Sequence, residues 1–513
     1  MHDIIAIPLV VGETGILCAA GFALFRRWEY TLAESAAYAI ITTLMLLSFL
    51  FQAAFLMGNP GLSPGIETLL SLLAVTTLVL LRDHIFAGWQ VARNFISVFP
   101  IPGKILFVGW CVLMFQAILL SPGESHLSSL NPVLLFQQHG RFFVPVTDEP
   151  VSALFPVNAI ILPHLVLRLN AHAGICFFGF LAYLSIGFST YALARRYSWP
   201  PTAFTVAMVV VSMPRLVYLS ASPGGEIIPA ATAVFCLLGI NRVVEQPNIR
   251  DFLLLILGIL FGISGDEISL IFPCILVILS CVLLIRRHGT GTWLAIMVRN
   301  PGATIAALFP ALVFSQCWLF LHNMLYADRW IGSATSFPRN PDGIQGALAN
   351  LARYILESAH FTWPADRLLN WMMGFSLTGT LQKIYDMLVF PFLGNSGATI
   401  PFAIQWVPGA SLSWFGPFAF LLVLPALLYA MMRGHRRLKA IAIALIGYVY
   451  IVTLILAWTP ENARFFSVFY ACGGFCIAFL LPPWRFTRTG KRILQVTSAI
   501  LLFYACICKL LGP

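Results

Sequence analysis

Long runs of apolar residues recur along this chain of 513 residues and limit its possible folds more than any other feature. Most runs are about 17–25 residues long and do not alternate between apolar and polar residues, which favours membrane-spanning helices over barrel strands. Apolar residues make up 59% of the chain and charged residues 10%, and the mean hydropathy is +0.88. A soluble protein of this size could not bury that much apolar surface, so the sequence predicts an all-α polytopic integral membrane protein.

The apolar runs predict about 14 transmembrane helices. They divide into an N-terminal block of three spans over 1–103, a core over 104–324 that includes a first external loop at 123–172, a second long external loop at 325–412, and a C-terminal block at 413–513. The predicted spans are 4–25, 34–57, 66–82, 104–122, 173–194, 202–221, 227–241, 251–264, 267–285, 302–324, 413–432, 440–458, 465–482 and 493–510.

One further apolar run, at 152–168, is harder to place. Pro156 and Pro163 interrupt it, and it closes with His164 and Arg168. We predict an interfacial helix here. A span is the alternative, and it would invert the topology of everything before it.

The placement of charge predicts which side of the membrane each loop faces. Of the 30 Lys and Arg residues, 20 lie in loops on one side of the predicted spans, which is the pattern of a cytoplasmic face. The net charge of +10 therefore reflects the membrane topology and does not indicate nucleic-acid binding. Both termini and both long loops then lie outside, where 13 of the 20 acidic residues gather.

The first external loop is where we look for chemistry, because acids are scarce in this chain. It contains Glu124, His126, His139, Asp148 and Glu149. The sequence has no GxxxxGK[ST], no GxGxxG after a predicted strand and no HExxH. This argues against an ATP-driven pump and a nucleotide-sugar enzyme, so the energy for a reaction would come from an activated substrate within the membrane. In the second loop, 343–357 shows amphipathic spacing that predicts a helix on the membrane surface.

The first loop resembles that of GT-C glycosyltransferases. Glu124-Ser125 is followed by Val133-Leu-Leu-Phe136-Gln-Gln-His139-Gly140, and the separation from acid to glycine matches the family's. Further segments similar to the family's, in the same order along 104–482, are Leu154-Phe155-Pro156-Val157-Asn158, Tyr191–Tyr197, Met213-Pro214 with Ala221-Ser222 and Glu226, Leu260–Gly265, and Asn462-Ala-Arg464-Phe465.

Three positions depart from the family's pattern. Glu124 stands where the family usually has Asp, and Ser128-Ser129-Leu130-Asn131-Pro132 replaces its Tyr-His-x-Pro-Arg segment. Asp266-Glu267 replaces the family's Lys near Gly265.

The resemblance implies a GT-C fold and a membrane glycosyltransferase. Such an enzyme moves a hexose or pentose from a polyprenyl-phosphate donor to a glycan, lipid or protein acceptor at the external or periplasmic face of a bacterial inner membrane. Its partners would be this donor and the lipid bilayer, with no nucleic acid.

Sugar transfer from such a donor needs a base for the acceptor proton and cations to steady the phosphate. A partly desolvated carboxylate can be that base, and we assign the role to Glu124, with direct inverting displacement. Glu124 is alternatively a ligand, with Glu226, of a divalent cation such as Mg²⁺ or Mn²⁺. The plainer reading is that Glu124 is a solvated loop acid.

The predicted substrate contacts lie on other outer turns. Glu226, Asp266 and Glu267 sit between spans and would face the same cavity, although ordinary turns also carry such acids. His126, Arg141 and Arg464 could contact phosphate. For Arg464, an ion pair with Glu461 is the equal alternative.

Two other classes of function stay open. A catalytically silent GT-C-like subunit of a membrane complex would fit the departures in the first loop. A transporter of a lipid-linked substrate would need charges inside the membrane, for which Glu13 in the first span is one candidate.

Overall fold

The structure is a computed structural model that describes residues 2–97, 101–119, 130–143, 155–223, 225–265, 267–327, 330, 338–358, 363–404, 415–481 and 487–511. Within these ranges it is helical, with isolated β-bridges but no strands. Within the same ranges, eleven helical segments are long and apolar enough to cross a membrane, and each overlaps a predicted span. The protein is therefore an all-α polytopic membrane protein. The other three predicted spans, at 202–221, 251–264 and 413–432, fall on shorter helices.

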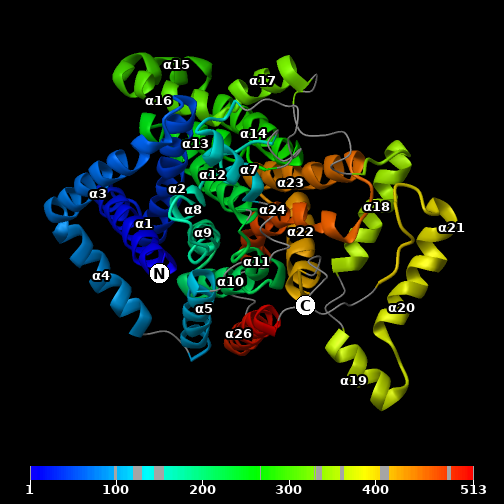
Figure 1. The fold of residues 1–513 in the computed structure, drawn as a ribbon. Coiled ribbons are helices and arrows are strands. Elements are labelled where there is room, and N and C mark those ends of the chain that lie inside the picture. The colour runs from blue at the N-terminus through cyan, green and yellow to red at the C-terminus, as the bar shows by residue number, and fades with distance from the viewer. Residues whose placement is uncertain are drawn as a thin grey trace. The chain divides into compact units, whose positions relative to one another are not determined.

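The chain forms two compact units, and unit 1 comprises 1–193 and 219–333. In it α1 packs against α2 and α3, and α12 and α13 pack together, with α16 against α13 (Figure 1). Its helices are α1 (His2–Arg27), α2 (Leu32–Leu56), η1 (Pro60–Leu62), α3 (Ser63–Leu80), α4 (Arg82–Ser97), α5 (Ile101–Leu119), α7 (Asn131–His139), α8 (His164–Leu167), α9 (Phe177–Ala194), α12 (Ile227–Glu245), α13 (Ile249–Phe261), η5 (Glu267–Leu270), α14 (Ile271–His288), α15 (Thr290–Arg299), α16 (Pro301–Phe314) and α17 (Cys317–Ala327).

Unit 2 comprises 194–218 and 334–513. Here α18 and α22 pack against α23, and α10 packs against α26. Its helices are α10 (Pro200–Val211), α11 (Pro214–Leu219), α18 (Gly343–Ser358), α19 (Trp363–Met373), α20 (Leu377–Ile384), η7 (Tyr385–Val389), α21 (Phe390–Leu393), η8 (Ala419–Val423), α22 (Leu424–Arg433), α23 (Arg436–Ile455), η9 (Pro460–Phe465), α24 (Phe466–Gly473), η10 (Gly474–Cys476), α25 (Ile477–Leu480) and α26 (Arg488–Leu511).

The helix ends follow local sequence signals. Thr31 and Glu34 form a reciprocal capping box at the start of α2. The Asn248 side chain accepts a hydrogen bond from the Arg250 amide where α13 begins. Basic residues occupy the last turn of α14, before Gly289 with its positive φ of 76°.

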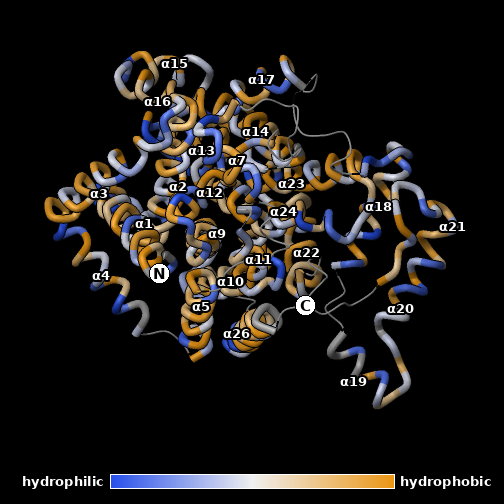
Figure 2. Tube along the Cα trace, in the orientation of Figure 1, coloured by the Kyte–Doolittle hydropathy of each residue, from blue (hydrophilic) through white to orange (hydrophobic). Residues whose placement is uncertain are grey.

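Burial separates central from peripheral helices in unit 1. Most side chains of α2, α9 and α12 are buried, whereas α3 and α16 expose most of theirs. Apolar residues cover the long helices, while α4 and α18 carry polar patches (Figure 2). The exposed apolar side chains on the peripheral helices are suited to contact with lipid.

The amphipathic helix predicted at 343–357 is present as α18. Its buried residues include Asn350 and Arg353. Arg353 is fully buried and donates to the Tyr385 hydroxyl at 3.0 Å and to the Asn350 side chain at 2.8 Å. The polar residues of α18 therefore hold the second loop together as well as making the helix amphipathic.

The interfacial helix predicted at 152–168 is wrong for the part that the structure describes. Residues 155–163 form turns, and the only helix in 155–168 is the four-residue α8. Ile161, Leu162 and Leu165 are fully buried. Pro156 and Pro163 remove backbone donors, and the segment folds inside unit 1, where other side chains satisfy its backbone.

Gly179 in α9 gives a test of this packing. A Cβ added there would lie 2.9 Å from the Ser220 carbonyl oxygen, which is backbone and cannot rotate away. We expect Gly179→Ala to lower the free energy of unfolding by roughly 1–3 kcal/mol, measured by thermal unfolding in detergent. Gly447→Ala is the control, because nothing lies within 4 Å of its Cβ position, and it should be neutral or slightly stabilising. Equal melting temperatures for the two variants would contradict the close packing at Gly179.

Candidate functional site

The predicted catalytic centre lies partly outside the described residues. Glu124, His126 and Asp266 fall there, as does the side chain of Glu267, whose backbone begins η5. The roles of Glu124 as base and as metal ligand therefore stay predictions.

Two turns that are predicted to lie on the outer face, and that carry predicted site residues, meet at one segment of unit 1. The Ala159 amide donates to Ser264 Oγ at 2.7 Å, and the Gly265 amide donates to the Pro156 carbonyl at 2.9 Å. Gly225 has a positive φ of 66°, and a Cβ there would lie 3.3 Å from Ala159 Cβ. The turn before Glu226 and the turn before Asp266-Glu267 therefore lie side by side, around residues 156–159.

Glu226 itself is exposed and stands at the N-cap position of α12 without a side-chain capping bond. Because Glu226 lies at the end of the turn, its carboxylate is on the surface of unit 1. A surface carboxylate at a helix N-terminus is electrostatically favoured, so this placement suits both a substrate contact and an ordinary helix-start charge.

The helix that follows Glu124 is anchored to the same region. α7 begins at Asn131, seven positions after Glu124, and ends at His139, which is followed by Gly140 in the left-handed conformation. Gln137 Nε2 lies 2.8 Å from His164 Nδ1 in α8. Beyond α7, Arg141 is exposed, so its guanidinium is available to an anion at the surface.

Aromatic side chains hold the end of α7 in place. The Phe136 and Phe142 rings pack edge to face at 4.8 Å, and Phe142 stacks on Trp318 of α17 at 4.8 Å. Each such pair adds roughly 0.5–1.5 kcal/mol beyond area burial. These contacts tie α7 and the residues just after it to the core of unit 1.

Beneath these turns lies a buried amide cluster formed by Asn158, Gln52 and Gln316. All three are fully buried. Asn158 Oδ1 accepts hydrogen bonds from Gln52 Nε2 at 2.9 Å and Gln316 Nε2 at 2.8 Å, and Gln316 Nε2 also donates to Gln52 Oε1 at 2.8 Å. Gln316 Oε1 accepts from the Val157 amide at 3.0 Å.

The amide cluster satisfies backbone groups where helices end or break. Residues 315–316 interrupt the long apolar span 301–326 between α16 and α17, and Gln316 has a positive φ of 56°. The two N–H groups of Asn158 Nδ2 lie within hydrogen-bonding distance of three carbonyl oxygens, those of Leu260 (3.1 Å), Ile263 (2.6 Å) and Phe314 (2.9 Å). In an apolar environment such carbonyls need internal partners, so Asn158 holds α13, α16 and the 155–168 segment together.

The Asn158 side chain is neutral and fully buried, and both its oxygen and its nitrogen form hydrogen bonds. An acid at this position would bring a charge into a cluster that holds no cation. Asn158 is therefore a structural residue below the site.

His164 is the second buried polar group beside α7. It is 3% exposed and packs edge to face against Phe51 and Phe55 at 5.2 and 4.9 Å. Burial, with a smaller contribution from the positive charge of Arg168, lowers the pKa of His164 to about 3. The ring is neutral at physiological pH.

This depressed pKa predicts a pH dependence of stability. The unfolded chain takes up a proton at His164 below about pH 6.5 and the folded chain does not, so His164 lowers the free energy of unfolding by about 1.4 kcal/mol per pH unit as the pH falls from 6.5 towards 3. We expect His164→Phe to reduce the loss of melting temperature between neutral pH and about pH 5. His139, which is exposed, supplies the control variant His139→Phe, which should keep the wild-type slope. A His164→Phe slope equal to the wild-type slope would contradict the buried neutral ring.

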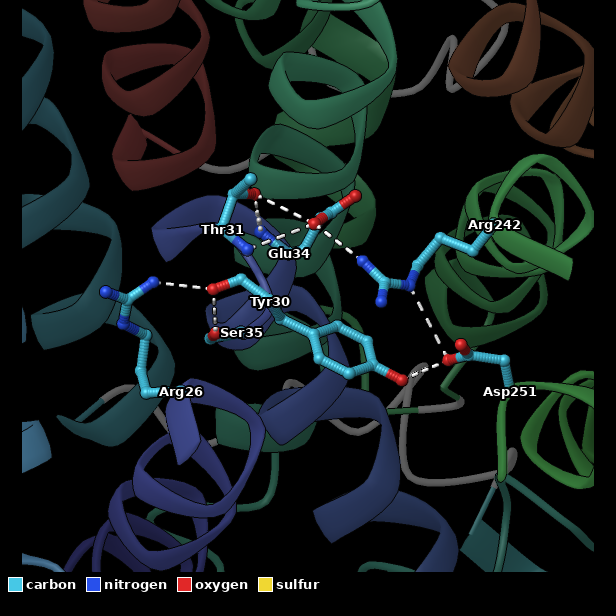
Figure 3. Close-up of polar contacts among 7 residues, drawn as sticks. All are labelled: Arg26, Tyr30, Thr31, Glu34, Ser35, Arg242 and Asp251. Carbon is cyan, nitrogen blue, oxygen red and sulfur yellow. Dashed lines mark hydrogen bonds and ion pairs between the residues drawn. The ribbon is translucent and has the colours of Figure 1, made fainter. Parts of the chain in front are cut away.

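A buried charged cluster occupies the loop between α1 and α2, on the predicted cytoplasmic side. Arg242 Nη1 lies 3.0 Å from Glu34 Oε2, and its Nε lies 3.6 Å from Asp251 Oδ1 (Figure 3). The guanidinium stacks 3.6 Å from the Tyr30 ring centroid, and the Tyr30 hydroxyl donates to Asp251. The groups compensate one another and join α2, α12 and α13, so the cluster is structural. Sequence analysis missed it, because its members lie far apart in the chain.

Arg464 belongs to unit 2. It is half-buried in η9, with its guanidinium carbon 5.0 Å from the Phe465 ring centroid. Thr459 begins η9 by accepting a hydrogen bond from the Asn462 amide, and Asn462 Nδ2 donates to the Ala457 carbonyl at 2.9 Å. The Asn-x-Arg stretch thus forms a tight turn, and this turn fixes the backbone position of Arg464.

The described residues contain no group of three or more His, Cys, Asp or Glu side chains placed to hold a metal ion. Since Glu124 lies outside them, the predicted divalent-cation site stays a prediction. No protein-family model, no curated protein and no solved structure matches this chain.

Proposed function

We propose that this protein is a membrane glycosyltransferase that moves a sugar from a polyprenyl-phosphate donor to an acceptor at the external face of the membrane. The single observation that carries the proposal is the meeting of the outer turns. Three segments carry the resemblance to GT-C enzymes, at 154–158, 221–226 and 260–265, and their described residues come together around Ala159. We further propose about 14 spans, a GT-C fold and a bacterial inner-membrane location.

The proposed reaction is a direct displacement. The Glu124 carboxylate takes the proton of an acceptor hydroxyl as the acceptor oxygen attacks the anomeric carbon. The bond from that carbon to the phosphate oxygen breaks, and the polyprenyl phosphate leaves with the electron pair. Attack opposite the leaving group inverts the anomeric configuration.

The charge on the departing phosphate needs a cation. Arg141, which is exposed just beyond α7, is our candidate for this cation. Its guanidinium suits the role because it can bind two phosphate oxygens at once. Asp266 and Glu267 follow Gly265, where the family has a Lys, so these acids suit the acceptor hydroxyls or a divalent cation in place of a phosphate contact.

The proposal is tested with the purified protein in lipid nanodiscs. Radiolabelled polyprenyl-phosphate pentoses and hexoses are supplied together with membranes from cells that lack the protein, as the source of acceptor. Transfer of label to a glycan, lipid or protein is expected with at least one donor, and EDTA followed by Mg²⁺ or Mn²⁺ tests the need for a metal. A folded protein that turns over none of the donors, in cells whose glycans do not change when it is deleted, would overturn the enzyme assignment in favour of a silent subunit.

A further inference from the structure

Glu13 is a carboxylic acid buried inside a predicted membrane span. It lies in α1, which packs against α2 and α3, and it is only 8% exposed. Its Oε1 atom is buried and has no hydrogen-bond partner among the described residues. An ionised carboxylate in such surroundings carries a large desolvation cost unless a cation compensates it.

The cation whose charge acts on Glu13 is already engaged by another acid. Arg168, just after α8, forms a two-pronged ion pair with Glu67 of α3, with Nη1 and Nη2 each donating to a different carboxylate oxygen. The Arg168 side chain is 15% exposed and that of Glu67 is 3% exposed. Nη1 also lies 3.4 Å from Ser63 Oγ. The guanidinium is oriented toward Glu67 by this bidentate geometry.

The charges around Glu13 therefore do not balance. Among the described residues, Glu67 and Arg168 are the charged groups whose electrostatic influence reaches it, and they neutralise each other. Of the other elements packed on α1, α8 offers His164, which is neutral, and α2 offers Glu34, which Arg242 binds. On α4, Arg82 and Asp83 form an exposed pair, while His84 and Arg93 are exposed. Glu13 and Glu67 are thus two buried carboxylates with a single guanidinium, that of Arg168, to compensate them.

We propose that Glu13 is a proton-binding site within the membrane, whose occupancy is coupled to the ion pair between Arg168 and Glu67. With Arg168 on Glu67, the Glu13 carboxyl carries the proton. If Arg168 moves to Glu13, the Glu13 O–H bond breaks and the proton passes to Glu67. One proton and one guanidinium then balance two carboxylates in either state.

This coupling has a structural consequence. Arg168 follows the segment that carries Asn158, and Glu67 and Glu13 belong to α3 and α1. The proton thus links α1 and α3 to the segment beneath the outer turns. The inference does not depend on sugar transfer, because Glu13 takes no part in the proposed reaction, and either proposal can fail alone.

Infrared spectroscopy tests the site directly. At neutral pH the wild-type spectrum minus that of Glu13→Gln should contain the carbonyl stretch of a protonated carboxylic acid. Glu67→Gln should also lose this band, because Arg168 is then free to pair with an ionised Glu13. Asp83→Asn, at an exposed acid, should keep it.

Chemical labelling gives a second readout. Dicyclohexylcarbodiimide, an apolar reagent for protonated carboxyl groups, should label Glu13 in the wild type and spare Glu67, with the position read by mass spectrometry. In Arg168→Gln the label should extend to Glu67. Absence of the infrared band in the wild type would overturn the proposal, as would a band that survives in both Glu13→Gln and Glu67→Gln. If Glu13→Gln does not fold, Glu67→Gln alone decides. An ionised Glu13 that binds Na⁺ would give no band, and this result would contradict the proposal that Glu13 binds a proton.

Discussion

Glu124→Gln is expected to lower the rate of sugar transfer by about 10²–10⁴-fold, the usual contribution of a general base. Glutamine keeps the size of the side chain but cannot accept the proton of the acceptor hydroxyl. Because the loss is in the chemical step, kcat should fall while KM for the donor changes little. The measurement is the initial rate of label transfer with saturating donor, at equal amounts of folded protein.

Asp386→Asn is the matched control for this variant. Asp386 is an exposed acid on the predicted outer face, and its carboxylate accepts a hydrogen bond from Gln382 at 3.0 Å. It should transfer sugar at the wild-type rate. If Glu124→Gln and Asp386→Asn were equally active, Glu124 would be a solvated loop acid and not the base.

Asn158→Leu should cause the largest loss of stability among single substitutions proposed for this chain. Leucine matches asparagine in size but offers no hydrogen bonds. It would leave the buried carbonyls of Ile263 and Phe314 short of partners. With about 1–3 kcal/mol for each buried group left unsatisfied, the free energy of unfolding should fall by roughly 2–6 kcal/mol. Thermal unfolding in nanodiscs measures the change.

Asn241→Leu separates the amide cluster from the general cost of losing a buried asparagine. Asn241 is 2% exposed, and its side chain donates to the Leu237 carbonyl of its own helix at 2.9 Å. That carbonyl keeps its own helix environment when Asn241 is lost, so the cost should be about 1 kcal/mol. Equal shifts for the two variants would show that Asn158 does not hold the broken helices together.

The membrane character and the positions of most helices could be predicted from sequence. A span is an unbroken apolar run, and α2, α12 and α23 follow from the composition of their own residues. The amphipathic spacing of α18 was equally local, and its residues coincide with the prediction. These features depend on neighbours in the chain, so a window of sequence contains their cause.

The segment at 155–168 could not be predicted in this way. Its apolar residues indicated a helix, but the folded chain buries it as turns whose backbone bonds to Gln316 and Ser264. Those partners lie more than 100 residues away in the sequence. Gln52 and Gln316 are unusual in sequence, because amide side chains are uncommon in apolar runs. Nothing in the sequence indicates which residues they contact.

By itself the sequence determined that this is a helical membrane protein, where most of its spans lie, and that Glu13 is an unusual acid in the first of them. Only the tertiary structure decided that Asn158 joins two interrupted helices, that Arg168 binds Glu67, and that Glu13 is left without a cation. The physical reason is that hydropathy sums over contiguous residues, whereas compensation of a buried polar group depends on which distant side chains the packing brings within hydrogen-bonding distance.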